Sequence, residues 1–396
     1  MGRSDIDLHF LIEPLPDIYA EAHFLRALAA RHAVLKRILP CLGDCEVSTE
    51  AELESWYRSR PYTWYRDRGW LRLYGKECQR PVITLTDGEG RDSLLWWFFW
   101  AWERLPGFYH SGNIRTCCNL FLDMVNAYGL YIGVLNRPLR RSEVLQYWRI
   151  LTPPSKERED VWNGFHNAFR GSYRKLLPWL YRESLKLCDA LYPHVAGKLE
   201  GEGGSMELRS QPPFRFSRWT YLLVNPLHTI DMSQALARME KNTEVVVVTE
   251  KTLKLYLYHR NPWEYYTLQA NGQMLPFAPP PAEALRRVVR FALHKEGPRR
   301  VGFAAGRKRD RSRAVGFEYA QCKLYVDHGV VAANAEDLVQ QYRLRYGSWP
   351  YSRRSSRDAY FQHDYPLVCQ TIEEISRQLV FNRAHVLSPR ETDEQQ

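Results

Sequence analysis

The chain has 396 residues, of which 45% are hydrophobic and 25% charged, and its formal net charge is +10. This composition excludes an intrinsically disordered protein, and the length favours two or three domains over a single hydrophobic core. The most apolar stretch, 94–102, is much shorter than the roughly 20 residues of a membrane-spanning helix, which excludes a membrane segment of that kind. The excess positive charge favours phosphate-bearing substrates or partners.

The cysteines and the first residues bear on the cellular compartment. The eight cysteines form no Cys-x-x-Cys pair, and no signal peptide precedes them. Disulfide frameworks and metal sites in short motifs use regular cysteine spacings, so this set is typical of reduced thiols. We therefore expect a soluble, cytoplasmic protein.

The first ninety residues predict a small mixed sheet with helices. A strand is predicted in the run 2–13, which contains Asp5 and Asp7, and further strands are predicted at 43–48 and 70–75. Between the first two strands, residues 17–39 carry apolar side chains at helical spacing, and Pro40 ends the pattern. Thr49 and Glu52 form a Thr-x-x-Glu capping box, which predicts that another helix begins directly after the second strand.

The rest of the chain predicts a helical stretch followed by a mixed one. Helices are predicted at 93–105, 114–135, 142–151 and 160–192, the last with a break at Pro178. The polar, Gly-rich segment 197–205 predicts a linker. Further strands are predicted at 218–224, 244–249 and 252–258, and further helices at 281–294 and 335–346. We therefore predict a mixed α+β chain with three parts: a first domain over 1–90, a helical domain over 91–196 and an α+β region over 206–396.

Two acidic residues at the start of the first strand indicate metal chemistry. Asp5 and Asp7 are two positions apart, so on a strand they share one face. Neighbouring carboxylates repel each other unless a cation lies between them, and oxygen donors suit Mg²⁺ or Mn²⁺. Glu46 joins them if the intervening helix returns the second strand beside the first. The alternative is a solvent-facing acidic edge strand. His9 shares the aspartate face and either touches a ligand or is satisfied by a neighbouring backbone group.

Three segments carry a resemblance to a known family. They are Ser4-Asp5-Ile6-Asp7-Leu8, Gly43-Asp44-Cys45-Glu46-Val47 and Leu73-Tyr74-Gly75-Lys76-Glu77. They resemble the Ser-Asp-hydrophobic-Asp strand, the third-acid strand and the Leu-Tyr-Gly turn of the nucleotidyltransferase superfamily, which includes antibiotic nucleotidyltransferases and relatives of DNA polymerase β. The resemblance covers the first predicted domain and, more loosely, the helical stretch.

The resemblance implies a nucleotidyl transfer reaction. A nucleoside monophosphate would move from an NTP, with ATP expected, to a hydroxyl acceptor, and pyrophosphate would leave. Asp5, Asp7 and Glu46 would hold Mg²⁺ or Mn²⁺, and Glu46 would also activate the acceptor hydroxyl as a general base. Ser4, the first residue of the matched Ser-Asp-hydrophobic-Asp segment, would bind the nucleotide. Asp44 competes with Glu46 for the third acidic position, because it lies two residues away on the same predicted face.

The chain departs from the family pattern at one point. The family's Gly-Ser turn lies further N-terminal to Asp-x-Asp, at a helix start, whereas only four residues precede Asp5 here. Gly2 and Ser4 are too close to the aspartates to form that turn. Two interpretations follow: the coding sequence begins upstream, or the chain is a truncated, inactive copy. In the second case the protein would be a nucleotide- or nucleic-acid-binding module that keeps the fold.

A basic segment indicates a polyanion as one candidate partner. Residues 286–313, from Arg286 to Arg313, contain eleven Lys and Arg residues against Glu296 and Asp310. Such a concentration of charge attracts nucleic acid, although a charge run is also typical of a solvated surface. Arg353, Arg354 and Arg357 lie near aromatic residues and form a second cluster of the kind that stacks on bases.

Overall fold

The structure is a computed structural model of the chain. It describes residues 6–39, 41–59, 73–75, 88–167, 176–195, 206–210, 219–224, 229–270, 272–293, 299, 309–351 and 359–386. The chain forms two compact units that alternate along the sequence. The terminal unit comprises Arg3–Glu52, Pro213–Phe216 and Val289–Gln396, and the central unit comprises Met1–Gly2, Leu53–Pro212 and Ser217–Val288.

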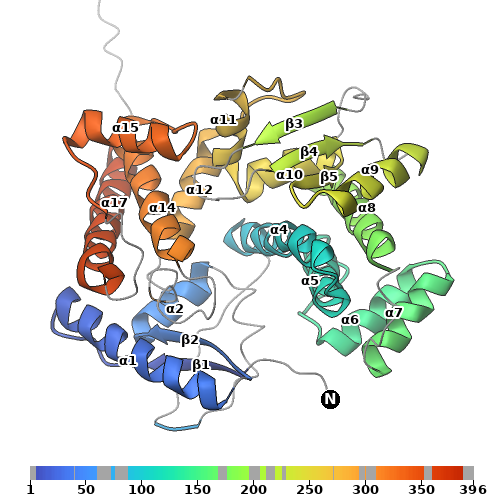
Figure 1. Ribbon diagram of the computed structural model, residues 1–396, viewed down its shortest axis with the longest axis horizontal. Coiled ribbons are helices and arrows are strands. Elements are labelled where there is room, and N and C mark those ends of the chain that lie inside the picture. Colours follow the sequence, from blue (N-terminus) through green and yellow to red (C-terminus); the bar gives the residue numbers. More distant parts are fainter. Residues whose placement is uncertain are drawn as a thin grey trace, which may run out of the picture. The chain divides into compact units, whose positions relative to one another are not determined.

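The terminal unit begins with a strand–helix–strand motif. Strand β1 (Ile6–Leu11) pairs in parallel with β2 (Leu42–Ser48), and helix α1 (Ile18–Ile38) connects them (Figure 1). The helix begins after Asp17, whose side chain accepts a hydrogen bond from the backbone N–H of Ala20 at 2.7 Å. Such a cap satisfies one of the free N–H groups in the first turn.

Helix α2 (Glu50–Ser59) follows β2 directly and begins at the predicted capping box. The Thr49 backbone N–H donates to Glu52 Oε2 at 2.8 Å, and the Glu52 N–H donates to Thr49 Oγ1 at 3.3 Å. Both halves of the reciprocal capping pattern are therefore present. This turn fixes the direction in which the chain leaves β2.

The core of the strand–helix–strand motif combines residues from two distant parts of the sequence. Cys45 and Val47 of β2 are buried against Leu25 of α1. Segments η2 (Tyr360–Asp364) and α17 (Tyr365–Val386) complete the same cluster. Their buried contributions are Tyr360, Phe361, Tyr365 and Cys369. Chain segments more than 300 residues apart thus bury one shared apolar surface.

Two further helices extend the terminal unit. Helix α14 (Arg309–His328) packs against α15 (Ala335–Tyr346) and α17 (Figure 1). Their interface buries Phe317, Leu324, Leu338 and Val368. The side chain of Asn334 caps α15 by accepting hydrogen bonds from the backbone N–H groups of Glu336 and Asp337, both at 3.0 Å.

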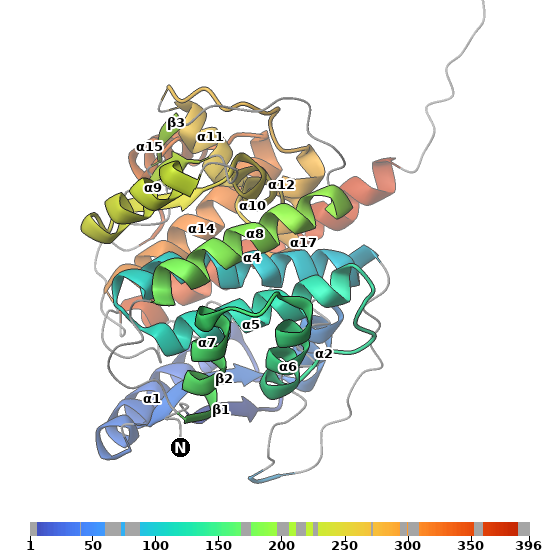
Figure 2. The same cartoon turned by 90° about the vertical axis from the view of Figure 1, so that its right-hand side faces the viewer.

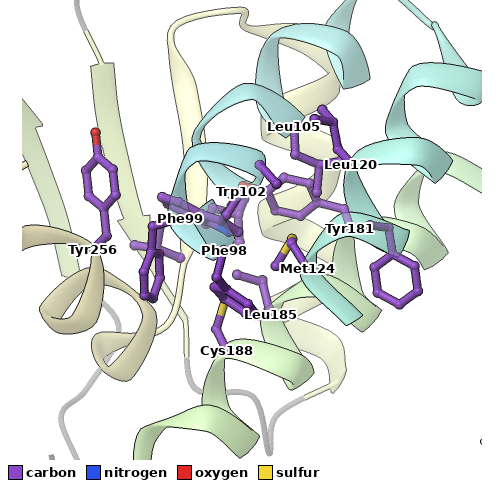
Figure 3. Packing of buried hydrophobic residues seen from close by; sticks show 14 of the residues in the cluster. Phe98, Phe99, Trp102, Leu105, Leu120, Met124, Tyr181, Leu185, Cys188 and Tyr256 are labelled. Carbon is purple, nitrogen blue, oxygen red and sulfur yellow. Dashed lines mark hydrogen bonds between the residues drawn. The ribbon is translucent and has the colours of Figure 1, made fainter. Parts of the chain in front are cut away.

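The first part of the central unit is helical. Its helices are α4 (Gly88–His110), α5 (Ile114–Tyr131), α6 (Arg141–Leu151), α7 (Lys156–Asn167) and α8 (Leu177–Val195). Helices α4, α5 and α8 lie side by side (Figure 2). Large aromatic side chains dominate their interface, among them Phe98, Phe99, Trp102 and Tyr181 (Figure 3). The high aromatic content of the sequence is therefore used in part to fill this core.

A three-stranded sheet forms the second part of the central unit. Strand β4 (Trp219–Leu223) pairs antiparallel with β3 (Met206–Ser210) and parallel with β5 (Val245–Val248). Helix α9 (Thr229–Lys241) connects the two parallel strands. The remaining helices are α10 (Glu250–His259), α11 (Pro262–Ala270) and α12 (Ala282–Ala292).

The predicted mixed α+β class is confirmed, and one local prediction is wrong. Residues 252–258 were expected to form a strand but lie in helix α10, which Thr249 caps through a 3.1 Å hydrogen bond from the N–H of Thr252. The helical range 160–192 is divided between α7 and α8, and Pro178, where a break was predicted, lies in the first turn of α8, where its missing N–H removes no helical hydrogen bond. The expected linker 197–205 and most of the expected strand 70–75 lie outside the described residues.

The structure also bears on the membrane and thiol predictions. None of the helices among the described residues combines the length and the apolar character needed to cross a bilayer.

Seven cysteines are described and all are free thiols. Burial raises the pKa of Cys117 to about 12 and that of Cys118 well above its ordinary value, so these adjacent thiols pack as small apolar groups.

Candidate functional site

The predicted acidic residues fall on β1 and β2, and the structure describes them unequally. Ser4 and Asp5 lie outside the described residues. Asp7 belongs to β1 and Asp44 to β2, where the structure describes the course of the backbone. Glu46 is described with its side chain. The strand–helix–strand connection therefore brings the segment of the first acidic pair beside the segment of the third acid.

The register of the two strands places Glu46 directly opposite His9. Adjacent strands lie about 4.8 Å apart, so paired residues on one face are immediate neighbours. The neighbouring pairs, Leu8 with Cys45 and Phe10 with Val47, belong to the opposite face, on which Cys45 and Val47 are buried in the core. Glu46 thus lies on the sheet face away from this core.

A β-bulge interrupts the register at the acidic positions. Ile6 pairs with Leu42, whereas Leu8 pairs with Cys45, so Gly43 and Asp44 both lie opposite Asp7. An extra residue bends a strand and redirects side chains, and bulges are frequent next to active sites. Asp44 lies within this bulge and Glu46 beyond it, in regular pairing with β1. The two candidates for the third acid therefore occupy different backbone environments.

His9, Glu46 and Ser48 form a polar group across the two strands. Nε2 of His9 is 3.0 Å from Oγ of Ser48, and Nδ1 of His9 is 3.4 Å from Oε2 of Glu46. The second contact is longer than an ordinary hydrogen bond, and it is an ion pair only when the imidazole is protonated. The side chains of His9 and Glu46 are 8% and 11% exposed. The structure therefore places the imidazole of His9 against the side chains of Ser48 and Glu46.

Lys36 of α1 contacts the bulge. Its Nζ donates a hydrogen bond to the backbone carbonyl of Gly43 at 3.3 Å. The contact satisfies a carbonyl group in the irregular part of β2, where strand pairing is locally disrupted. It also brings a positive charge to the strand that carries Asp44 and Glu46. Sequence reasoning did not select Lys36, because it lies on a helix with several other basic residues.

A buried arginine, Arg299, forms a hydrogen bond with the backbone of β2. Arg299 is only 2% exposed and donates to the carbonyl of Val47 at 3.1 Å, next to Glu46 in the sequence. Its guanidinium also contacts Glu21 of α1 at 2.6 Å and both carboxylate oxygens of Glu52, at 2.6 and 3.1 Å. Tyr365 donates to Glu21 in the same network. Arg299 thus connects α1, β2, α2 and α17.

The opposite charges in this network shift the pKa values of Glu52 and Arg299 in favour of their charged forms. Burial of Glu52 opposes its charged form, but the hydrogen bond and the charge of Arg299 outweigh that effect and hold the pKa of Glu52 below its usual value. Burial likewise disfavours the charged form of Arg299, yet its acidic neighbours raise its pKa. Both groups are therefore ionised at neutral pH.

The basic segment 286–313 contributes to the interior as well as to the surface. Arg299 lies in the buried network. Arg287 of α12 forms an ion pair with Asp92, with 2.9 Å between Nε and Oδ2, and its Nη1 lies 3.1 Å from Nδ1 of His259. Arg286 is exposed and 3.9 Å from Glu283. Two of the residues expected to attract a polyanion therefore bind carboxylates of the chain itself. The second cluster, Arg353, Arg354 and Arg357, lies outside the described residues.

The metal prediction depends on side chains that the structure does not describe. In the described part of the chain, no three His, Cys, Asp or Glu side chains come close enough to hold a metal ion. The predicted set, Asp5, Asp7 and Glu46, contains one described side chain. Its chemistry, three carboxylates, is the donor type that Mg²⁺ prefers.

Comparison with protein-family models, curated proteins and solved structures gives no match to this chain.

Proposed function

We propose that the chain is a Mg²⁺-dependent nucleotidyltransferase that moves a nucleoside monophosphate from an NTP to a hydroxyl acceptor and releases pyrophosphate. The observation that carries this proposal is the parallel pairing of His9 with Glu46. It brings a carboxylate beside the strand that contains Asp7, on the sheet face away from the core. The resemblance of the same two segments to the nucleotidyltransferase superfamily supports the proposal independently of this pairing.

The proposed roles follow from the chemistry of the residues. Asp5, Asp7 and Glu46 would hold Mg²⁺, and the ion, when bound, would neutralise charge on the triphosphate. Glu46 would accept the proton of the acceptor hydroxyl, since a carboxylate is a suitable general base when it lies within hydrogen-bonding reach. Ser4 would donate a hydrogen bond to a phosphate oxygen. The net positive charge of the chain would favour the approach of the nucleotide.

The substrates are proposed at the level of chemical class. ATP is the expected NTP, with Mn²⁺ as an alternative ion. The acceptor is a hydroxyl on a small molecule, a protein side chain or an RNA end. If an RNA end is the acceptor, the exposed part of the basic segment would contribute phosphate contacts, and binding would weaken with rising salt concentration.

The proposal is tested by measuring pyrophosphate release. The full chain is incubated with Mg²⁺, each NTP and pools of small-molecule, protein and RNA acceptors. We expect release that depends on both Mg²⁺ and an acceptor, and that is lost in Asp7→Asn and Glu46→Gln. These substitutions remove a charge but keep the size of the side chain, so a loss would reflect the site chemistry.

Two other outcomes would contradict the enzyme proposal in different ways. Mg²⁺-dependent nucleotide binding without pyrophosphate release would favour the non-catalytic alternative, a binding module that keeps the fold. The absence of both binding and release, with Asp5→Ala and Asp7→Ala leaving every property unchanged, would contradict a nucleotide function altogether. His23→Ala is a suitable control, because this residue is exposed on α1 and has no role in the proposed site.

A further inference from the structure

We propose that His9 is a positioning residue: held in place by Ser48, it orients the carboxylate of Glu46 for metal binding. This inference rests on the proposed function, because it assigns a task to the contact between His9 and a proposed metal ligand. It adds two residues, His9 and Ser48, to a site that the resemblance limits to acidic groups and one serine.

The imidazole of His9 is fixed from two sides. Its Nε2 is within hydrogen-bonding distance of Ser48 Oγ, at 3.0 Å, and its side chain is 8% exposed. Ser48 is itself held, because its backbone carbonyl accepts a hydrogen bond from the N–H of Ile12 at 3.0 Å. The ring therefore cannot turn freely, and the atom facing Glu46, Nδ1, has a defined position.

The hydrogen-bonding capacities of the three side chains select one arrangement of protons. An ionised carboxylate can only accept, so contact with Glu46 requires a proton on Nδ1, and the neutral ring that meets this condition is the Nδ1–H tautomer. Nε2 is then an acceptor, and the Ser48 hydroxyl donates to it. In this arrangement Ser48 sets the tautomer and Nδ1–H points toward Glu46. Carboxylates that ligate metals are commonly held by contacts from neighbouring side chains, and Nδ1 of His9 lies 3.4 Å from Glu46 Oε2.

The order Ser48, His9, Glu46 also resembles the relay of a serine hydrolase, but the position of Ser48 argues against a nucleophile. Ser48 is 6% exposed and is the last residue of β2. The chain enters the Thr49 capping turn immediately afterwards. A nucleophile must be reached by its substrate, so the geometry assigns Ser48 to support of the ring.

The inference is tested by titrating the full chain with Mn²⁺ and measuring the free ion by electron paramagnetic resonance. We expect His9→Ala to weaken Mn²⁺ binding about 10-fold, the lower end of the effect of removing a hydrogen bond to a metal ligand. His9→Asn should recover part of the affinity, because its side-chain amide places an N–H near the position of Nδ1. Ser48→Ala should weaken binding less than His9→Ala.

Control variants separate positioning from folding. His23→Ala removes an exposed histidine on α1 and should leave Mn²⁺ affinity unchanged. Urea unfolding of each variant shows whether it is folded. A purely structural role for His9 would lower the unfolding free energy of His9→Ala and leave the Mn²⁺ affinity of the folded protein at the wild-type value, and that result would overturn the inference.

The outcomes also separate this inference from the proposed function. Wild-type protein that binds Mn²⁺ through Asp7, with His9→Ala binding equally well, would overturn the positioning role and leave the proposed function standing. Wild-type protein that binds no Mn²⁺, or binds it equally after Asp5→Ala and Asp7→Ala, would overturn both.

Discussion

Arg299 shows how a single residue can join segments that are distant in the sequence. Glu21 and Glu52 are 278 and 247 residues away from it, yet both bind its guanidinium. Removing one partner of a buried ion pair leaves the other charge uncompensated in a poorly solvated place, which costs far more than an exposed pair contributes. Arg299 therefore has a role that its place in a basic segment does not reveal.

Arg299→Met should lower the free energy of unfolding by about 3 kcal/mol, because Glu21 would remain buried without its cation, whereas the Glu52 side chain is 34% exposed and solvent compensates part of its charge. Arg286→Met is the matched control from the same basic segment. Its contact with Glu283 is exposed and 3.9 Å long, so the expected loss is below about 1 kcal/mol. Urea unfolding measures both values. Equal losses for the two variants would contradict the structural role of Arg299.

The depressed pKa of Glu52 predicts a pH dependence with a definite sign. Its charged form contributes stability in full above the ordinary pKa of 4.5, and the contribution is lost as the pH falls through the lower pKa of the folded state. The unfolding free energies of wild type and Glu52→Gln should therefore differ most near neutral pH and converge in acid. Urea unfolding at pH 7 and at pH 3 measures this difference. The contributions of the other titrating groups are the same in both proteins and cancel when the two unfolding free energies are subtracted. A gap that widens in acid would show that the sign is wrong.

At the scale of elements, local capping signals predicted helix starts well. Asp17 and the pair of Thr49 and Glu52 lie within a few residues of the backbone groups that they satisfy, so the sequence alone contains the whole interaction. Helix α10 was wrongly predicted as a strand for the opposite reason. Leu253, Leu255 and Leu257 alternate, but all three are buried, because α10 is enclosed on several sides. In such a helix the apolar pattern has no helical period to detect.

Two glycines in adjacent helices provide a matched pair of substitutions. A Cβ on Gly129 of α5 would lie 2.7 Å from Cδ1 and 2.8 Å from Cγ of Leu135. Leu135 cannot easily move, because its backbone N–H donates to the Gly129 carbonyl at 2.9 Å. A Cβ on Gly107 of α4 would meet nothing within 4 Å.

Gly129→Ala should therefore destabilise the protein by about 1–3 kcal/mol, as expected for overpacking. Gly107→Ala should stabilise it by up to about 1 kcal/mol, because alanine loses less conformational freedom in a helix. Thermal unfolding followed by circular dichroism gives the sign of each change. Stabilisation by both substitutions would contradict the close packing of α5 against the loop that follows it.

The candidate site was predictable only in part. The alternation of β1, the helical spacing of α1 and the capping box sufficed to expect Glu46 beside β1. The bulge opposite Asp7 was not predictable, because it depends on how two strands pair and not on either strand alone. The contact of His9 with Ser48 likewise requires the register, and Lys36 requires the position of the helix over the sheet.

At the scale of the whole molecule, the terminal unit depends on segments that the central unit separates in sequence. Leu25 and Val47 share a buried cluster with Tyr360 and Phe361. Neither the first sixty residues nor the last helices contain that cluster alone, so no window of the sequence displays it. The strands of the proposed site pack against this cluster, and Arg299 hydrogen-bonds β2. Residues from Val289 onward therefore belong to the same unit as β1 and β2.

The most direct test of the proposed function follows the phosphates of ATP. The full chain is incubated with Mg²⁺ and acceptor, in parallel with ATP labelled at the α-phosphate and at the γ-phosphate. Nucleotidyl transfer predicts that the α label joins the acceptor and the γ label leaves in pyrophosphate, in equal amounts, with both lost in Glu46→Gln. Transfer of the γ label to the acceptor, or no transfer of either label, would contradict the proposed function.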